Sequence, residues 1–490
     1  MTLFLQSIRE ASVDGRMQNV LYRQDQFEKL HRILVQHGEH IQKTMVKDGT
    51  HTDTEAKIEY FFALRSLKEY YETLDSDKAL HQEYAISRGE DSPAQAEPIG
   101  IVYVAITEHT VFYSTIAAIC AALAAGNCVV IQVRVDNHYI YRRLKMPTES
   151  ELFGEVSTLI RQLLADKSLD RDVIAVVVDR PSKADLGPNH IRVFQNPLKT
   201  QESLDFNHEI TSPSGCVIAI VDRTADLDSA AQALVAARFS FGGTSPYAPD
   251  IILVNEFVKR PFLAAVTNAM VSFLEDRRFD SRIPERTKPQ DDSLDLVAAL
   301  GQAELFEVTF REFNVIQNRN SSRRLLVHGV RSLDDAIDLA NGNRKLIASY
   351  IFADLVSAKY LTQFITTHVS FVNQIPLELL IGPAAPQQIG FDRSLRYPIS
   401  LFSQRCPAFV TSMPFNDLLQ HTMQGQGAEI SHALMEISKA LKPSKPRPNG
   451  GGVGFFEQGI LIGLALFGIP ILVSVGFLGT KGAQYVSRLL

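Results

Sequence analysis

The 490-residue chain has no tryptophan, only four cysteines and no excess of positive charge. No two of the cysteines form a C-x-x-C pair, which excludes a disulfide scaffold and a structural zinc finger. Lys and Arg number 49 against 55 for Asp and Glu, so no nucleic-acid partner is expected. Cysteines this few and this scattered indicate a reducing, cytosol-facing compartment.

The composition is that of a folded protein with more than one domain. Hydrophobic residues make up 45% of the chain and charged residues 21%, which excludes a largely disordered protein. At about 150 residues per domain, the length predicts two or three domains. The 13 histidines show no H-x-x-x-H spacing, and we expect no metal site.

The hydrophobic pattern changes along the chain. In the first 90 residues apolar positions such as Phe27, Leu30 and Leu34 recur at helical steps, and a Gly-, Asp-, Ser- and Pro-rich connection follows at 88–100. Short β-branched runs then alternate with helical segments, one of which is Ala-rich and stops at Gly126. The predicted strands are IGIVYVAI (99–106), NCVVIQV (127–133), DVIAVVV (172–178) and GCVIAIV (215–221). This alternation predicts a mainly parallel α/β sheet with right-handed crossovers.

The segment from Gln458 to Thr480 contains 23 residues and no charge. It would form roughly 35 Å of helix, enough to span a bilayer. A buried core helix is the alternative, but apolar residues on every face over such a length favour the membrane. Cations upstream, such as Lys442 and Arg447, outnumber those downstream, which leaves the large N-terminal part in the cytosol. We therefore expect a single-pass tail anchor, with the endoplasmic reticulum as the leading membrane.

Several stretches resemble one enzyme family. PIGIVYVAI and AALAAGNCVVI, within 98–131, resemble the first strand–helix–strand of the coenzyme domain of aldehyde dehydrogenases. DGRMQNVLYRQDQFEKLHRIL (14–34) is similar to the opening helix of the class 3, fatty-aldehyde branch. VDRTADLDSAAQALVAARFSFGGTSPYAPDIILV (221–254) resembles the segment with the catalytic thiol, and VRSLDDAIDLANGNRKLIASYIFA (330–353) a later helix and strand. The microsomal members of that branch also carry a C-terminal anchor.

The resemblance implies an α/β fold with two Rossmann-like parallel-sheet domains, an oligomerisation arm and a C-terminal transmembrane helix. It also implies a homodimer or a heterodimer with an active paralogue, and a long-chain aldehyde as candidate ligand. We accordingly divide the chain into an N-terminal helical segment (1–95), a coenzyme-domain-like part (96–208), a catalytic-domain-like part (209–400), an arm with a Pro/Gly-rich linker (401–457), the anchor (458–480) and a short tail (481–490).

The family's chemistry sets firm requirements on residues. A thiolate attacks the aldehyde, hydride passes to NAD or NADP, and a Glu-activated water releases the acid. Counted back from Ala248, Pro249 and Asp250, the thiol position is occupied by Pro246. Proline has neither a nucleophile nor a backbone N–H, so it can neither attack a carbonyl nor stabilise an oxyanion. The adjacent Ser245 is the candidate nucleophile, with a plain loop serine as the alternative.

The other implied catalytic positions also depart from the family. His109 stands at the oxyanion-hole asparagine and is a candidate donor, although a surface loop histidine is the alternative. The general-base position falls at Ser212, and Glu209, three residues earlier, is the candidate base against an exposed structural glutamate. Cys216 is the candidate substitute thiol, against a buried strand cysteine.

The motifs implied to bind NAD or NADP are altered as well. The family's Lys-Pro-Ser-Glu reads QVRV at 132–135, which removes the fixed positive donor. The glycine-rich pyrophosphate turn is replaced by HIRVFQNPLKT (190–200), which has no glycine for close approach. The Glu-x-Phe-Gly-Pro motif reads RNSSR at 319–323. We therefore assign no cofactor-binding residue.

The sequence thus predicts a membrane-anchored, aldehyde dehydrogenase-like pseudoenzyme with a binding or scaffold role. The alternative is an NAD(P)-dependent oxidoreductase that oxidises lipid or pathway aldehydes through a rearranged site with Cys216 or Ser245. Hydrolysis of activated acyl groups through Ser245 is a third hypothesis.

Overall fold

The computed structural model divides into two compact units, Met1–Ala408 and Phe409–Leu490, and each is described by itself. The structure describes residues 2–48, 51–90, 96–133, 154–196, 208–275, 294–301, 303–309, 323–342, 346–386, 396–405, 413, 415–425, 428–439, 455–468, 470 and 477–479.

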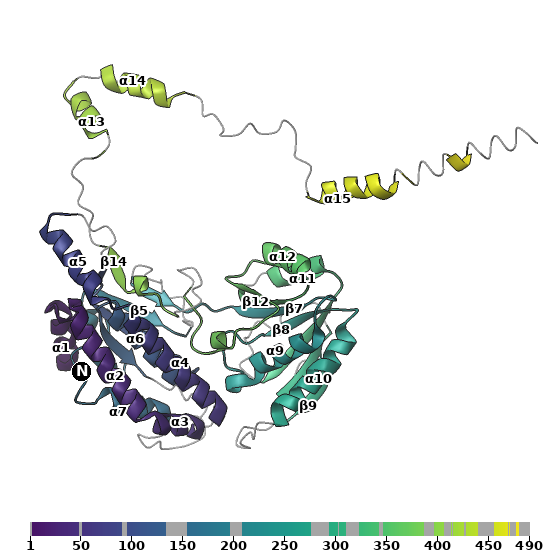
Figure 1. Ribbon diagram of the computed structural model, residues 1–490, viewed down its shortest axis with the longest axis horizontal. Coiled ribbons are helices and arrows are strands. Elements are labelled where there is room, and N and C mark those ends of the chain that lie inside the picture. Colours follow the sequence, from purple (N-terminus) through teal and green to yellow (C-terminus); the bar gives the residue numbers. More distant parts are fainter. Residues whose placement is uncertain are drawn as a thin grey trace, which may run out of the picture. The chain divides into compact units, whose positions relative to one another are not determined.

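Helices dominate the described part of the first 90 residues, as the periodicity predicts (Figure 1). They are α1 (Thr2–Val13), η1 (Arg16–Gln18), α2 (Val20–Gln36), α3 (Gly38–Lys47), α4 (Asp53–Glu72) and α5 (Ser76–Ser87). The Asn19 side chain caps α2 by accepting from the N–H groups of Leu21 and Tyr22. Thr52 and Glu55 form a capping box that starts α4.

The first sheet has the strand order β4-β3-β2-β5-β6, and all of its pairings are parallel. In register, Ile101 lies opposite both Cys128 and His190. Three of its strands fall within the predicted apolar runs. The elements are β2 (Ile101–Ala105), α6 (Val111–Ala124), β3 (Cys128–Gln132), α7 (Glu155–Leu164), β4 (Ile174–Val177), α8 (Lys183–Leu186), β5 (His190–Phe194) and β6 (Glu209–Thr211).

Helix α6 is buried along nearly its whole length because it packs against α4 as well as β3. Its alanines are small enough to let both neighbours approach closely. The helix ends before Gly126, whose φ of 90° is left-handed, as the predicted stop requires. A Cβ on this glycine would lie 3.1 Å from the carbonyl oxygen of Met17.

The second sheet has the order β13-β12-β7-β8-β11-β10-β9 and is parallel except for β9, which runs antiparallel to β10. Val217 and Ala219 pack on one face with residues of α9 and α10, and Ile218 and Ile220 pack on the other with α11 and α12 (Figure 1). The predicted α/β fold with parallel sheets is confirmed. The elements are β7 (Cys216–Val221), α9 (Leu227–Phe239), η3 (Ser240–Gly243), β8 (Ile251–Asn255), α10 (Lys259–Glu275), β9 (Leu294–Leu300), β10 (Ala303–Val308), β11 (Arg324–Val330), α11 (Leu333–Asn341), β12 (Leu346–Phe352), α12 (Leu355–Phe364) and β13 (Ser370–Val372).

The end of the first unit returns to the first sheet. After η5 (Leu377–Leu380) and η6 (Ile399–Leu401), strand β14 (Ser403–Arg405) pairs antiparallel with β1 (Ala96–Pro98). The Asn127 side chain accepts from the N–H of Gly100 at 2.8 Å and donates to the carbonyl of Phe402 at 2.8 Å. The buried Asn127 side chain therefore links the returning segment to the loop before β2 through two hydrogen bonds.

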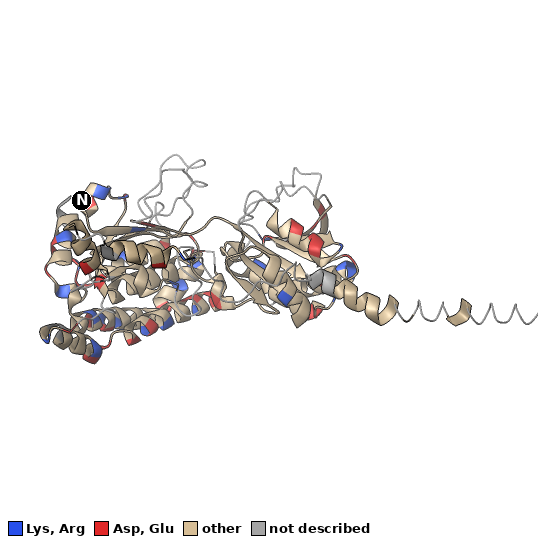
Figure 2. Cartoon of the chain, turned by 90° about the horizontal axis from the view of Figure 1, so that it is seen from above, with Lys and Arg blue, Asp and Glu red and all other residues tan. Residues whose placement is uncertain are grey.

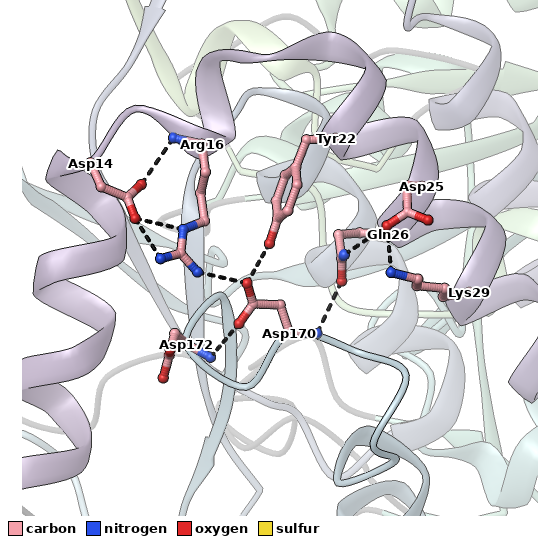
Figure 3. Close-up of polar contacts among 8 residues, drawn as sticks. All are labelled: Asp14, Arg16, Tyr22, Asp25, Gln26, Lys29, Asp170 and Asp172. Atoms are coloured by element: carbon pink, nitrogen blue, oxygen red, sulfur yellow. Dashed lines mark hydrogen bonds and ion pairs between the residues drawn. The ribbon is translucent and has the colours of Figure 1, made fainter.

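A polar network joins the N-terminal helices to the loop before β4 (Figure 3). Asp170 accepts from Arg16 Nη1 at 2.8 Å and from the Tyr22 hydroxyl at 2.5 Å. Its backbone N–H donates to Gln26 Oε1 at 3.1 Å. Burial raises the pKa of the Asp170 carboxyl, but the hydrogen bonds that this carboxylate accepts outweigh burial and hold the pKa below the usual value of 3.8.

The second unit contains α13 (Asn416–Met423), α14 (Ala428–Ile437), α15 (Phe455–Gly463) and the π-helical turn η7 (Leu464–Gly468). Residues 459–468 carry no charged side chain (Figure 2). In the described part of the chain, no helix is long and apolar enough to cross a membrane. Of the expected anchor, 458–480, residues 469, 471–476 and 480 lie outside the described residues.

Candidate functional site

Three segments that are distant in sequence meet at His109, in the loop after β2. Its Nδ1 lies 2.8 Å from Thr244 Oγ1, just after η3, and its Nε2 lies 2.7 Å from the carbonyl oxygen of Leu380, in η5. A carbonyl only accepts, so Nε2 carries the proton donated to Leu380. His109 is only 6% exposed, which corrects the alternative of a surface loop histidine. The two hydrogen bonds satisfy both ring nitrogens and so offset the cost of burying the ring.

Two non-glycine residues beside His109 have left-handed backbones. Thr110 has a φ of 44° and Phe241 a φ of 49°, which costs energy for residues with a Cβ. Both are held by hydrogen bonds: Thr110 Oγ1 accepts from the N–H of Gly382 at 2.7 Å, and the N–H of Phe241 donates to Glu55 Oε1 at 2.9 Å. The surrounding structure thus fixes strained backbone on two sides of the site.

The candidate nucleophile Ser245 lies in a buried turn. It is 1% exposed, and its Oγ accepts from the N–H of Tyr247 at 3.3 Å. Pro246, at the thiol position implied by the resemblance, is buried beside it. The hydroxyl that contacts the His109 ring belongs to Thr244, the residue before the candidate. The structure therefore brings His109 and the 244–246 segment together.

The candidate base Glu209 belongs to the first sheet. It forms a buried ion pair with Arg192, its register partner on β5, and lies 3.8 Å from Lys183 Nζ. Glu209 is 7% exposed, which corrects the alternative of an exposed glutamate, since Arg192 compensates the buried charge. Ser212, at the implied base position, donates to the carbonyl of Ala384 at 2.8 Å.

Cys216 is the first residue of β7 and is partly exposed. Its side chain packs with the cluster on the α11 and α12 face of the second sheet, whereas Tyr247 packs with the cluster on the opposite face. Cys120 and Cys128 are fully buried, and burial raises the pKa of the Cys128 thiol to about 12. Such thiols are poor nucleophiles at neutral pH.

Gln132 ends β3 at the position where the resemblance implies a lysine for the coenzyme. It is 8% exposed, and both ends of its amide are bound to protein. Its Oε1 accepts from the Tyr103 hydroxyl, and its Nε2 donates to the carbonyl of Val178 at 2.9 Å. The neighbouring residues 134 and 135 lie outside the described residues.

Gln195 fills the equivalent place after β5, where the resemblance implies a glycine-rich turn. Its Oε1 accepts from the N–H of Thr107 at 3.1 Å, and its Nε2 donates to the carbonyl of Ser114 at 3.0 Å. Nucleotides bind beyond the carboxyl ends of parallel strands, where they need free N–H groups and close backbone approach. Along the described part of this edge the two glutamine amides are already satisfied. Neither glutamine side chain can therefore bind a nucleotide without giving up a protein partner.

The described residues also hold no cluster of three or more His, Cys, Asp or Glu able to bind a metal ion. Residues 197–200 and 319–322 of the altered coenzyme motifs lie outside the described part of the chain.

Two buried carboxylates of α4 support this site, and no motif in the sequence predicted them. Glu55 accepts from the N–H of Phe241, and Glu59 Oε1 accepts from the N–H of Tyr113, in α6, at 2.9 Å. His51 Nε2 lies 2.9 Å from Glu59 Oε2. Burial alone would lower the pKa of His51, but the Glu59 carboxylate outweighs it and raises that pKa above 6.5. The capping box was the one local signal, and it does not reveal partners in other elements.

Comparison with known proteins gives consistent likenesses. The sequence model of the aldehyde dehydrogenase family matches residues 7–137. Aldehyde dehydrogenase family 3 member B1 of Mus musculus is 24% identical over 391 residues, covering 71% of this chain and 77% of the mouse protein. Member B2 of Mus musculus is 23% identical over 387 residues, covering 71% of this chain and 76% of that protein.

A solved structure shows the same fold. The substrate-bound state of Staphylococcus aureus AldH superposes with a TM-score of 0.66 at 16% identity, covering 88% of this chain and 99% of the bacterial one. The chain is therefore related to the aldehyde dehydrogenase family, as its motifs predict, with members of family 3 among its relatives.

Proposed function

We propose that this aldehyde dehydrogenase-like protein acts by binding, as a pseudoenzyme, and that it oxidises no aldehyde. The observation that carries the proposal is the arrangement at the thiol position. Pro246 stands there, and the His109 ring is hydrogen-bonded to Thr244, two residues before it, and to Leu380. A proline supplies no nucleophile, and a ring engaged at both nitrogens would have to break a hydrogen bond to reach an oxyanion.

The coenzyme edge supports the same proposal. Hydride transfer requires a nucleotide held across the strand ends, and the amides of Gln132 and Gln195 are engaged with their neighbours there. A protein that keeps the aldehyde dehydrogenase-like fold without its dehydrogenase chemistry can still act by offering a surface to which a partner binds.

We further propose that the protein is anchored to a membrane through the uncharged segment 458–480, with its main part in the cytosol. The endoplasmic reticulum is the first membrane to examine. A second copy of this chain or a catalytically active relative is the proposed protein partner, and a long-chain aldehyde the candidate ligand.

The test is turnover by the full chain in detergent micelles. Formation of NADH or NADPH is followed with a long-chain fatty aldehyde, next to a family 3 enzyme as positive control. We expect no turnover from the wild type, and none from Ser245→Ala or Cys216→Ala. Turnover that disappears in either variant would instead establish the alternative, an NAD(P)-dependent oxidoreductase with a rearranged site.

A further inference from the structure

Helices α13 and α14 of the second unit each expose a stripe of apolar side chains. On α13, Leu419 and Met423 are 53% and 89% exposed and lie one turn apart. On α14, Leu434 and Ile437 are 57% and 76% exposed, and Ile430 precedes them by one turn. Steps of three and four residues place these side chains on one stripe of each helix.

The side of each helix opposite its stripe carries polar residues. On α13, His421 lies about 160° around the helix from Leu419, and on α14, His432 lies about 160° from Leu434. Both histidines are exposed. Met435, which is 71% exposed, lies about 100° from Leu434, between the stripe and the polar side. The helices also contact each other, so their faces belong to one hairpin of the second unit. An exposed apolar stripe beside a polar face is typical of a helix that lies on another surface.

The sequence directly after α14 carries charge of one sign. Lys439, Lys442, Lys445 and Arg447 follow the helix, and the next acidic residue is Glu457. The uncharged segment 458–480 begins directly after it. A cluster of cations next to a membrane segment is attracted to anionic lipid headgroups.

We propose that the α13–α14 hairpin lies in the interface of an anionic membrane. Its apolar stripes enter the boundary of the acyl chains, and the positive charge of the sequence that follows α14 favours anionic headgroups. This inference rests on the proposed anchor, which brings the hairpin within reach of the bilayer. The run of cations favours anionic lipid over a second copy of this chain, because two copies would bring like charges together.

The absence of tryptophan makes a direct test simple, because one introduced indole reports alone. Leu434→Trp and Leu419→Trp place it on the apolar stripes, and His432→Trp and His421→Trp place it on the opposite, polar sides as matched controls. Each full-length variant is reconstituted into vesicles of phosphatidylcholine and phosphatidylserine. Emission is recorded with bromine-labelled lipids, and separately with aqueous iodide.

We expect the two stripe variants to show blue-shifted emission, to lose most of it to brominated lipid and to resist iodide. The two control variants keep their emission with brominated lipid and lose it to iodide. In phosphatidylcholine alone, and in Lys442→Gln/Lys445→Gln on the Leu434→Trp background, quenching by brominated lipid decreases.

Equal quenching of stripe and control positions would overturn the proposal. Stripe positions that resist both quenchers would also overturn it, and would indicate that protein covers the hairpin. Vesicle flotation separates this proposal from the anchor. A chain that floats without lipid quenching of the stripes refutes the hairpin alone, and a chain that does not float refutes both.

Discussion

Glu55 is expected to be a main support of the candidate site, and Glu55→Gln tests this. The carboxylate is 2% exposed and accepts two backbone hydrogen bonds, from Phe241 at 2.9 Å and from Thr52 at 3.0 Å. A glutamine has the same shape but one acceptor oxygen, so one of the two N–H groups must face its NH₂ group. Hydrogen bonds to charged groups contribute about 1.5–3 kcal/mol. We expect the free energy of unfolding to fall by about 2 kcal/mol.

The assay is urea unfolding of the full chain in detergent, followed by circular dichroism. With a slope of about 3 kcal/mol per molar urea, the midpoint of the first unit should fall by about 0.7 M. The matched control is Glu72→Gln, an exposed glutamate on the same helix, which should change stability by less than about 0.5 kcal/mol. Hydrogen exchange at the Phe241 amide should accelerate by about tenfold or more, since each 1.4 kcal/mol corresponds to a factor of ten. If Glu55→Gln behaved like Glu72→Gln in both measurements, the supporting role of Glu55 would be refuted.

Three further predictions concern other positions. Because Glu59 raises the pKa of His51, their ion pair stabilises the fold fully below pH 6.5, and this stabilisation is lost as the pH rises through the higher pKa of the folded state. The melting temperature, measured as a function of pH, should fall over that range, and the fall should be smaller in His51→Gln. Gly382→Ala should lower the free energy of unfolding by about 2–4 kcal/mol, because φ is +85° and the new Cβ would lie 2.5 Å from the Tyr113 ring. Gly301→Ala, at φ +58° with open space around the new Cβ, should lower it by only about 1 kcal/mol, and equal losses in urea unfolding would contradict this. Asp170→Asn should lower the free energy of unfolding by about 1–2 kcal/mol at neutral pH, because it weakens the network of Figure 3, and an unchanged urea midpoint would count against this. The loss should vanish in acid, because a carboxyl with a lowered pKa stabilises the fold only above the pH at which it protonates in the folded state.

Three strands of the first sheet, β2, β3 and β4, could be predicted because their signals are local, whereas β5 and β6 were not predicted. β2 and β3 are continuous apolar runs with β-branched residues, and strands buried on both faces need such runs. Gly126 stops α6 because its backbone is left-handed there. The antiparallel edge strand β9, with Leu296 55% exposed, was not predicted, since an exposed edge strand lacks the continuous buried pattern.

The site could be predicted only in part, because its contacts connect distant residues. His109 was identified by its position after β2, but its burial depends on Leu380, which lies 271 residues away. Glu209 was considered either as a candidate base or as an exposed structural glutamate, and its burial depends on Arg192 on the neighbouring strand. The contact between Glu55 and Phe241 spans 186 residues, so a single sequence carries no local trace of it.

The most direct test of the proposed loss of dehydrogenase chemistry is calorimetric titration of NAD and NADP into the folded full chain in detergent micelles. The engaged amides of Gln132 and Gln195 predict no saturable heat with either nucleotide. Saturable binding with a Kd of about micromolar to millimolar, the ordinary range for enzyme substrates, would contradict that prediction and restore the dehydrogenase hypothesis.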